Sequence, residues 1–145
     1  MTEVAFHFNA PDKLGYACRL VRKAVTAGAR VVVTGEQALL RELDLALWTF
    51  APLEFIPHCH GADCSPAAQA ASLVVLADSP RQTPHQQVLV NLGEPVPDGF
   101  ERFERLIEVV TVLDEDRLRA RQRWKHYADR GYAITRHDLA GREAG

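Results

Sequence analysis

Three short runs of consecutive apolar residues constrain the fold of this chain more than any other feature. They are residues 30–34 (RVVVT), 72–77 (SLVVLA) and 87–92 (QVLVNL). Apolar residues at consecutive rather than alternating positions are typical of strands that are buried on both faces of a parallel sheet. Such a sheet needs helices on both faces to cover it, which favours the α/β class of folds.

Helical patterns lie where such a sheet requires them. Apolar residues recur at helical spacing from Lys13 to Thr26, and leucines fall on one side of residues 36–47. With a strand predicted at residues 4–8, the first part of the chain is a strand–helix–strand unit. The acids at residues 114–116 favour the beginning of a last helix, which we expect to end near Arg130.

The remaining segments complete the expected domain. Residues 53–56 are predicted to form a short extended piece, and residues 100–112 a short helix followed by a last strand. We therefore predict one α/β domain at residues 1–136, with a mostly parallel central sheet, helices on both faces and a Rossmann-like topology without a nucleotide motif. Residues 137–145 are expected to form a loosely ordered tail.

Length and composition agree with a single domain. The chain has 145 residues, of which 47% are hydrophobic, so it can bury a core without the help of disulfide bonds or a structural metal. It has no apolar run of membrane-spanning length and no basic, signal-like N-terminus, so we expect a cytoplasmic protein without membrane contact. The odd number of cysteines favours reduced thiols, and Cys18 falls on the apolar side of its helix, where we expect it to be core.

The net charge of −2 hides an asymmetry along the chain. From Arg117 to Arg136 there are seven Lys and Arg residues and one acid, Asp129, so this segment carries +6 and the rest of the chain −8. A basic segment on an otherwise acidic protein indicates an anionic partner for that segment.

The sequence lacks the motifs by which α/β proteins most often bind nucleotides or perform catalysis. The turn after the second predicted strand has one glycine, Gly35, and the patterns GxGxxG, GK[ST] and GxSxG do not occur. We therefore expect no cofactor and no catalytic activity from the chain itself. A nucleotide site remains a minor alternative, because an open α/β sheet offers a crevice at its strand ends.

Histidines and cysteines at residues 58–64 raise the question of a metal site. His58, Cys59, His60 and Cys64 are all possible zinc ligands. However, Cys59 and His60 are adjacent, and the paired CxxC or HxxxH spacing of structural zinc sites is missing. We expect a surface loop without metal and keep zinc as the lesser alternative.

Aromatic residues and prolines crowd the segment that follows the second predicted helix. Trp48, Phe50 and Phe55 lie within residues 45–58, and prolines flank them. These side chains could fill the core, or they could form an exposed platform for a protein partner, because Trp and Phe dominate the energetics of such contacts. The sequence leaves both interpretations open.

The last predicted helix concentrates the positive charge. Arg117, Arg121 and Lys125 are spaced at i, i+4 and i+8 and therefore share one face, with Trp124 beside them. Arg119 and Arg123 fall on a different face, which indicates a broad basic surface with almost no acids among the bases. Such a surface suits a nucleic-acid backbone or an acidic peptide with an apolar anchor.

Three segments together resemble the chi subunit of bacterial DNA polymerase III. They are VAFHF at residues 4–8, DLALWTFAPLEFIPH at residues 44–58 and RWKHYADRGYAI at residues 123–134. The resemblance extends in order over nearly the whole chain, although the loop at residues 59–71 cannot be matched residue by residue.

The resemblance implies a non-catalytic accessory subunit of the clamp loader. Chi subunits form a heterodimer with the psi subunit and also bind the acidic, Phe-terminated C-terminal tail of single-stranded-DNA-binding protein. By position, the psi-facing residues would be Trp48, Phe55, Pro57 and His58. The tail-binding residues would be Arg117, Arg121, Trp124 and Lys125, with Val112 and Leu113 near the apolar slot. The alternative is a protein that binds single-stranded DNA directly through the same basic helix.

Overall fold

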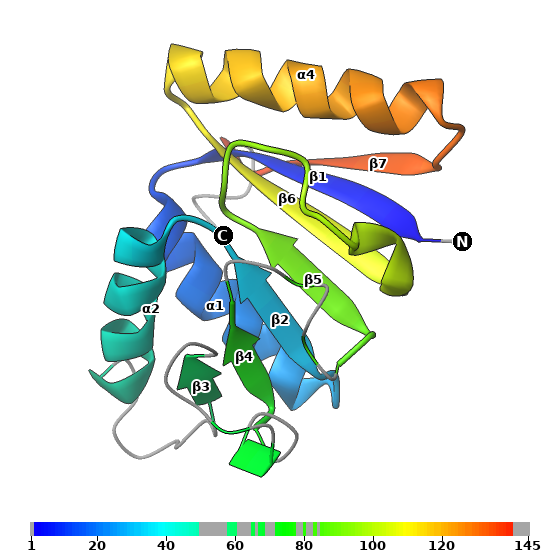
Figure 1. Ribbon diagram of the computed structural model, residues 1–145. Coiled ribbons are helices and arrows are strands. Elements are labelled where there is room, and N and C mark those ends of the chain that lie inside the picture. Colours follow the sequence, from blue (N-terminus) through cyan, green and yellow to red (C-terminus); the bar gives the residue numbers. More distant parts are fainter. Residues whose placement is uncertain are drawn as a thin grey trace.

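Strands and helices alternate along the chain (Figure 1). The structure is a computed structural model that describes residues 2–49, 58–60, 65, 67–68, 72–77, 80, 83 and 85–140, without the side chains of residues 48, 49, 59 and 60. Its elements are β1 (Glu3–Ala10), α1 (Lys13–Thr26), β2 (Val31–Thr34), α2 (Gln37–Thr49), β3 (His58–His60), β4 (Val74–Leu76), β5 (Val88–Asn91), the 3₁₀ turn η3 (Phe100–Arg102), β6 (Arg105–Thr111), α4 (Asp114–Asp129) and β7 (Ile134–Asp138).

The strands of the described residues form one parallel sheet. Seven strands lie in the order β3-β4-β2-β5-β6-β1-β7, and each pair of neighbours is parallel. The chain crosses from β1 to β2, and β5 and β6 later fill the space between these two strands. Because all the strands run the same way, their carboxyl ends meet at one end of the sheet, where the connections to the helices begin.

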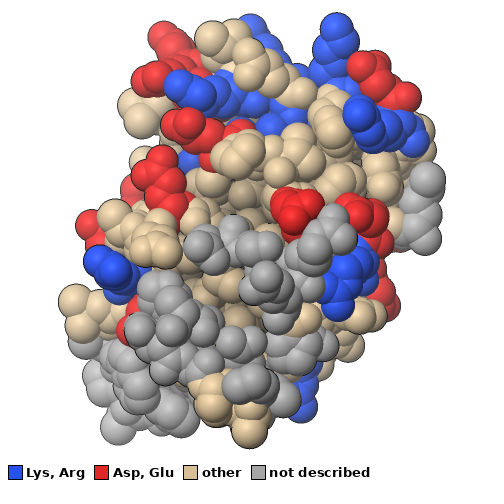
Figure 2. All heavy atoms as spheres, in the orientation of Figure 1, with Lys and Arg blue, Asp and Glu red and all other residues tan. Residues whose placement is uncertain are grey.

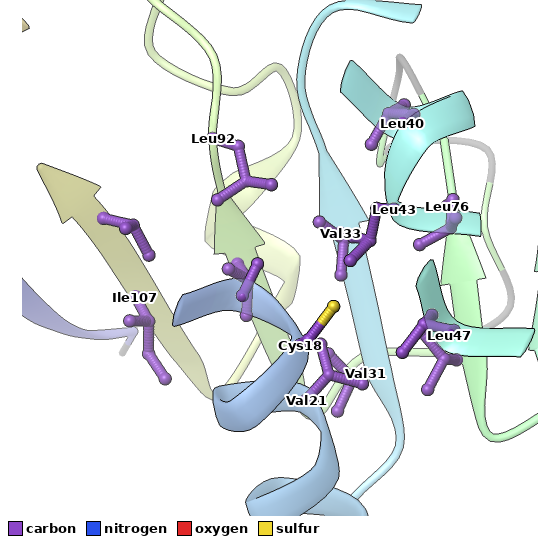
Figure 3. Close-up of a cluster of buried hydrophobic side chains, with 14 of the residues drawn as sticks. Cys18, Val21, Val31, Val33, Leu40, Leu43, Leu47, Leu76, Leu92 and Ile107 are labelled. Carbon is purple, nitrogen blue, oxygen red and sulfur yellow. The ribbon is translucent and has the colours of Figure 1, made fainter. Parts of the chain in front are cut away.

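Helices cover both faces of the sheet. In Figure 1, α1 and α2 lie on one face and α4 on the other. Val31 and Val33 of β2 pack toward α1 and α2, whereas Val32 between them belongs to the cluster under α4. The first cluster includes Cys18 and is drawn in Figure 3. The predicted α/β class, the parallel sheet and the core position of Cys18 are therefore confirmed.

Two elements differ from the sequence-based expectations. The segment at residues 100–112 has a single 3₁₀ turn at its beginning, and β6 already begins at Arg105 because from that residue onward it pairs with both β1 and β5. No local sequence pattern predicts β7, which pairs with β1 and ends at Asp138. As an outer strand with mostly exposed side chains, β7 lacks the apolar run by which the inner strands are recognised. The predicted extended piece at residues 53–56 lies outside the described residues.

A kink near the end of β1 shapes the surface beside α4. The register of β1 against β6 shifts between His7 and Ala10, and Asn9 has a positive φ of 65°. Asn tolerates this left-handed conformation better than most residues with a side chain. The kink places the Asn9 side chain between α4 and β7, where it contacts Arg117 and Asp138.

Among the described residues, no helix has both the length and the apolar character that a membrane crossing requires.

Candidate functional site

The beginning of α4 is stabilised by a carboxylate instead of an N-cap side chain. Leu113 occupies the N-cap position and makes no side-chain cap hydrogen bond. Asp116 accepts hydrogen bonds from the N–H (2.8 Å) and the hydroxyl (2.9 Å) of Thr111 and lies 3.0 Å from the Lys13 ammonium. Partial burial raises the pKa of Asp116, but these hydrogen bonds and the Lys13 charge outweigh it and hold the pKa below the ordinary value.

A basic hollow lies between α4, β1 and β7. We call it the cationic hollow; its volume is about 590 Å³, and it is open to solvent. Two arginines come from α4, while a third arginine comes from β7, which is distant in the sequence. The residues that define it are Phe8, Asn9, Arg117, Arg121, Trp124 and Arg136.

Aromatic rings form the apolar part of the cationic hollow. Trp124 is half-buried, and the centre of its ring lies 4.9 Å from the centre of the Phe6 ring. The Arg136 guanidinium lies 5.2 Å from the centre of the Phe8 ring and 6.0 Å from that of Trp124. These distances are within the range of cation–π attraction, so Arg136 holds its charge over an aromatic surface.

The three arginines of the hollow differ in how firmly they are held. Arg117 donates a hydrogen bond of 2.5 Å to Asn9, whose amide in turn donates to Asp138 at 2.8 Å. The hydrogen bond from Asn9 is the main cause that lowers the pKa of Asp138, so this acid is ionised at neutral pH. Arg121 has no acidic partner in the part of the chain that the structure describes. Its charge is therefore available to an anionic ligand.

The structure brings together three of the six predicted tail-binding residues. Arg117, Arg121 and Trp124 all line the cationic hollow. Lys125 is exposed one turn further along α4 and does not line the hollow. Val112 and Leu113 line a different hollow on the other side of the beginning of α4.

Phe8, Asn9 and Arg136 are not among the tail-binding residues predicted from the sequence. The sequence predicts a strand at Phe8, but a strand position gives no indication that the ring borders a cation. Arg136 follows α4 after a turn, so its return beside Trp124 depends on the pairing of β7 with β1. One usable signal was present, because Phe6 and Phe8 alternate and must face the same side of a sheet.

The predicted broad basic surface is wrong for two arginines of α4. Arg123 is 2% exposed, and its Nε donates a hydrogen bond of 3.0 Å to the fully buried carboxylate of Glu108 in β6. Arg119 lies 3.1 Å from Glu94 and 3.3 Å from Glu115. Two of these acids lie outside α4, Glu108 in β6 and Glu94 in the loop after β5, whereas Glu115 lies in the first turn of α4 itself.

Glu108 is the centre of a buried polar network. Besides Arg123, it accepts a hydrogen bond of 2.5 Å from the Tyr127 hydroxyl and bonds of 2.9 and 3.1 Å from the Asn91 amide. Burial raises the pKa of Glu108, against the opposing effects of Arg123 and of these donors. Burial and the Glu108 charge also raise the pKa of Tyr127, so its hydroxyl remains a donor. The network attaches α4 to β5 and β6.

Most of the predicted psi-facing set lies outside the described residues. Phe55 and Pro57 are not described, nor is the side chain of Trp48. His58 is in β3, and its side chain is 1% exposed, with Nε2 3.1 Å from an oxygen of Asp44 in α2. The imidazole of His58 therefore packs between the sheet and α2.

Side chains that could ligate a metal ion do not gather among the residues that the structure describes. Within them, no group of three His, Cys, Asp or Glu side chains is arranged to hold a metal ion. The segment considered for zinc is described only at residues 58–60, where it forms β3.

Figure 2 shows Lys and Arg side chains over α4, and Asp and Glu side chains at and below the end where this helix begins. The acidic area includes a second hollow at the carboxyl ends of the strands, which we call the strand-end hollow, with a volume of about 480 Å³. Its apolar residues include Leu39, Val112 and Leu113, and its acids include Glu36, Glu94 and Glu115. The molecule therefore has hollows of opposite charge on the two sides of α4.

Comparisons with known proteins agree with the resemblance noted in the sequence. The family model described as "DNA polymerase III chi subunit, HolC" matches residues 1–135. The DNA polymerase III subunit chi of Pseudomonas aeruginosa is 31% identical over 144 residues, which cover 96% of this chain and 98% of that protein. The DNA polymerase III subunit chi of Haemophilus influenzae is 27% identical over 120 residues, or 82% of each chain.

Proposed function

This chain belongs to the family of DNA polymerase III chi subunits, and on that premise we propose that it bridges two proteins without catalysing a reaction. Membership of the family makes it a protein of DNA replication within the polymerase complex. The proposed partners are the psi subunit and the acidic C-terminal tail of single-stranded-DNA-binding protein.

The observation that carries the tail-binding half of the proposal is the composition of the cationic hollow. Arg117, Arg121 and Arg136 line the same hollow as the aromatic rings of Trp124 and Phe8, and Arg136 lies over both rings. A peptide that ends in aspartates and a phenylalanine offers the complementary groups. Its carboxylates can pair with the guanidinium groups, and its terminal ring can pack against Trp124.

The energies of the individual contacts predict a modest and salt-sensitive affinity for the tail. Exposed ion pairs contribute about 0–1 kcal/mol each, and an aromatic contact adds roughly 0.5–1.5 kcal/mol beyond its buried area. The arginines therefore guide and orient the peptide, while the packing of its aromatic end contributes much of the specificity. Because surface charges are screened by salt, the affinity should fall as the ionic strength rises.

Calorimetry with a synthetic peptide of aspartates ending in phenylalanine tests this half of the proposal. The wild-type chain should bind the peptide at low salt and more weakly at high salt. Arg121→Glu should abolish binding because it places a carboxylate among the peptide's acids, whereas the thermal midpoint of unfolding should not change. The matched control is Arg41→Glu, an equal charge reversal at an exposed position of α2, which should bind like the wild type.

Two results would reject the tail-binding assignment. One is an unchanged affinity of Arg121→Glu for the peptide. The other is tighter binding of a bare single-stranded oligonucleotide than of the peptide, with the same loss in Arg121→Glu. The second result would support the alternative of a direct nucleic-acid-binding protein.

The psi-binding half of the proposal rests on the family and on the aromatic segment at residues 45–58. If Phe55 faces psi, Phe55→Ala should lose the complex in size-exclusion chromatography with little change in the melting temperature of the isolated chain. A buried Phe would instead cost about 3–5 kcal/mol of stability when truncated, which a thermal melt would detect. A large drop in the melting temperature would therefore contradict the proposed role of Phe55.

A further inference from the structure

The strand-end hollow contains exposed aliphatic side chains that folding does not explain. Val112 is 49% exposed and Leu113 is 66% exposed, and both border the hollow together with the half-buried Leu39. Leu113 stands at the N-cap of α4, where Ser, Thr, Asp or Asn would stabilise the helix better. Asp116 supplies the hydrogen bonds that bind the beginning of the helix to Thr111, so Leu113 is not needed for that purpose.

The charge of the strand-end hollow is negative, and its basic groups are already paired. Five acids and two bases line it, which leaves a net charge of −3. Of the two bases, Lys13 lies 3.0 Å from Asp116, and Arg119 lies between Glu94 and Glu115. The uncompensated charge of this hollow therefore attracts cations and repels phosphate groups.

From these observations we infer that the strand-end hollow binds a basic protein segment that carries an aliphatic or aromatic anchor. The anchor would cover Val112, Leu113 and Leu39, and Lys or Arg side chains on either side would face Glu36 and Glu94. A buried apolar centre with a charged rim is the usual arrangement of a small protein interface. The inference does not depend on the proposed function, because the acidic tail would occupy the opposite side of α4.

Two peptides with reversed charges test the inference directly. The first probe is a short peptide of Lys and Arg with one central Leu-Phe pair, and the second has Asp in place of each base. Each is titrated into the ¹⁵N-labelled chain and followed by NMR. The basic peptide should shift the amides of residues 36–39, 92–94 and 111–116, whereas the acidic peptide should shift those around Trp124 and Arg136.

Leu113→Ser removes the most exposed part of the apolar centre. It should weaken binding of the basic peptide roughly tenfold, as expected for an interface anchor. The matched control is Leu118→Ser, because Leu118 is 56% exposed on the same helix but does not line the hollow. Leu118→Ser should bind the basic peptide like the wild type. Because Leu113 is exposed, both variants should remain folded, which circular dichroism verifies.

A charge variant provides a second, independent measurement. Glu36→Gln should weaken binding of the basic peptide a few-fold. The control is Glu42→Gln, which neutralises an exposed acid of α2 and should leave this binding unchanged. The inference is overturned if Leu113→Ser and Leu118→Ser bind the basic peptide equally, or if this peptide shifts the cationic hollow instead. Arg121→Glu should leave basic-peptide binding intact, so failure of the tail-binding proposal can be distinguished from failure of this one.

Discussion

Arg121 and Arg123 are two residues apart on α4 and have opposite roles. Arg121 is exposed in the cationic hollow and has no acidic partner among the described residues. Arg123 is buried, with Glu108 as its partner, and its Nη1 also donates a hydrogen bond of 2.9 Å to the carbonyl oxygen of Glu94. Because two residues of an α-helix differ by about 200° in direction, one guanidinium points along the surface and the other into the sheet.

The direction of each side chain therefore decides what its charge does. An exposed arginine of this helix can bind a ligand, whereas a buried arginine attaches the helix to the sheet. An exposed guanidinium costs little to keep and is free to pair with a ligand. A buried guanidinium must be matched by an acid and by further hydrogen bonds, because desolvation of an unpaired charge is strongly unfavourable. The Glu108 network therefore holds α4 in the orientation that presents Arg117, Arg121 and Trp124 to the hollow.

Removal of Arg123 should have the largest effect on stability. Arg123→Met leaves the Glu108 carboxylate buried without its cation, and breaking a buried pair in this way costs about 3–5 kcal/mol. Urea denaturation of Arg123→Met and of Arg121→Met as the control would measure the contrast, and the control should change by less than about 0.5 kcal/mol. Equal stability of the two variants would contradict the division of roles.

The same variant should also depend on pH in a defined direction. Burial raises the pKa of Glu108, and a raised pKa in the folded state means that the contribution of this group to stability is fully present at low pH and is lost as the pH rises through that pKa. Without Arg123 to oppose it, this effect should be larger. Arg123→Met should therefore recover part of its lost stability when the pH is lowered from 8 to about 5.

Tyr127→Phe should have the next largest effect. It removes one hydroxyl that donates to Glu108 and leaves the carboxylate partly unsatisfied, at a cost of about 1–3 kcal/mol. Tyr132→Phe is the matched control, since Tyr132 is only half-buried and packs beside Tyr127 through its ring. Comparable losses in both variants, measured by thermal unfolding, would contradict a specific contribution of the hydrogen bond from Tyr127 to Glu108.

The smallest effect on stability is expected at Asp116, which is half-buried and so lies between the exposed Arg121 and the buried Arg123 in its environment. Asp116→Asn should lose about 1 kcal/mol at neutral pH, because the charged interactions with Lys13 and the helix N-terminus are weakened. A lowered folded pKa means that this contribution is present above the ordinary value of 3.8 and is lost as the pH falls through the folded pKa. The difference between wild type and variant should therefore shrink below about pH 4, as acid denaturation curves would reveal.

Local sequence patterns predicted the fold class and the internal elements well. Residues 31–34 are buried at every position, as their consecutive apolar pattern indicated. The periodicity from Lys13 to Thr26 matched α1 to the residue, because a long amphipathic helix carries a strong signal. The pattern failed at β7, whose position depends on its partner β1 and not on its own composition.

Helical spacing alone determined that Arg117, Arg121 and Trp124 of this chain share one side of α4, because i, i+4 and i+7 positions always lie together. Only the tertiary structure decided which arginines remain exposed. Glu108 reaches Arg123 from β6 and Arg136 reaches Trp124 from β7, and both encounters depend on the order of strands in the sheet. Contacts between segments distant in the sequence are set by the packing of the whole domain, so no local pattern contains them.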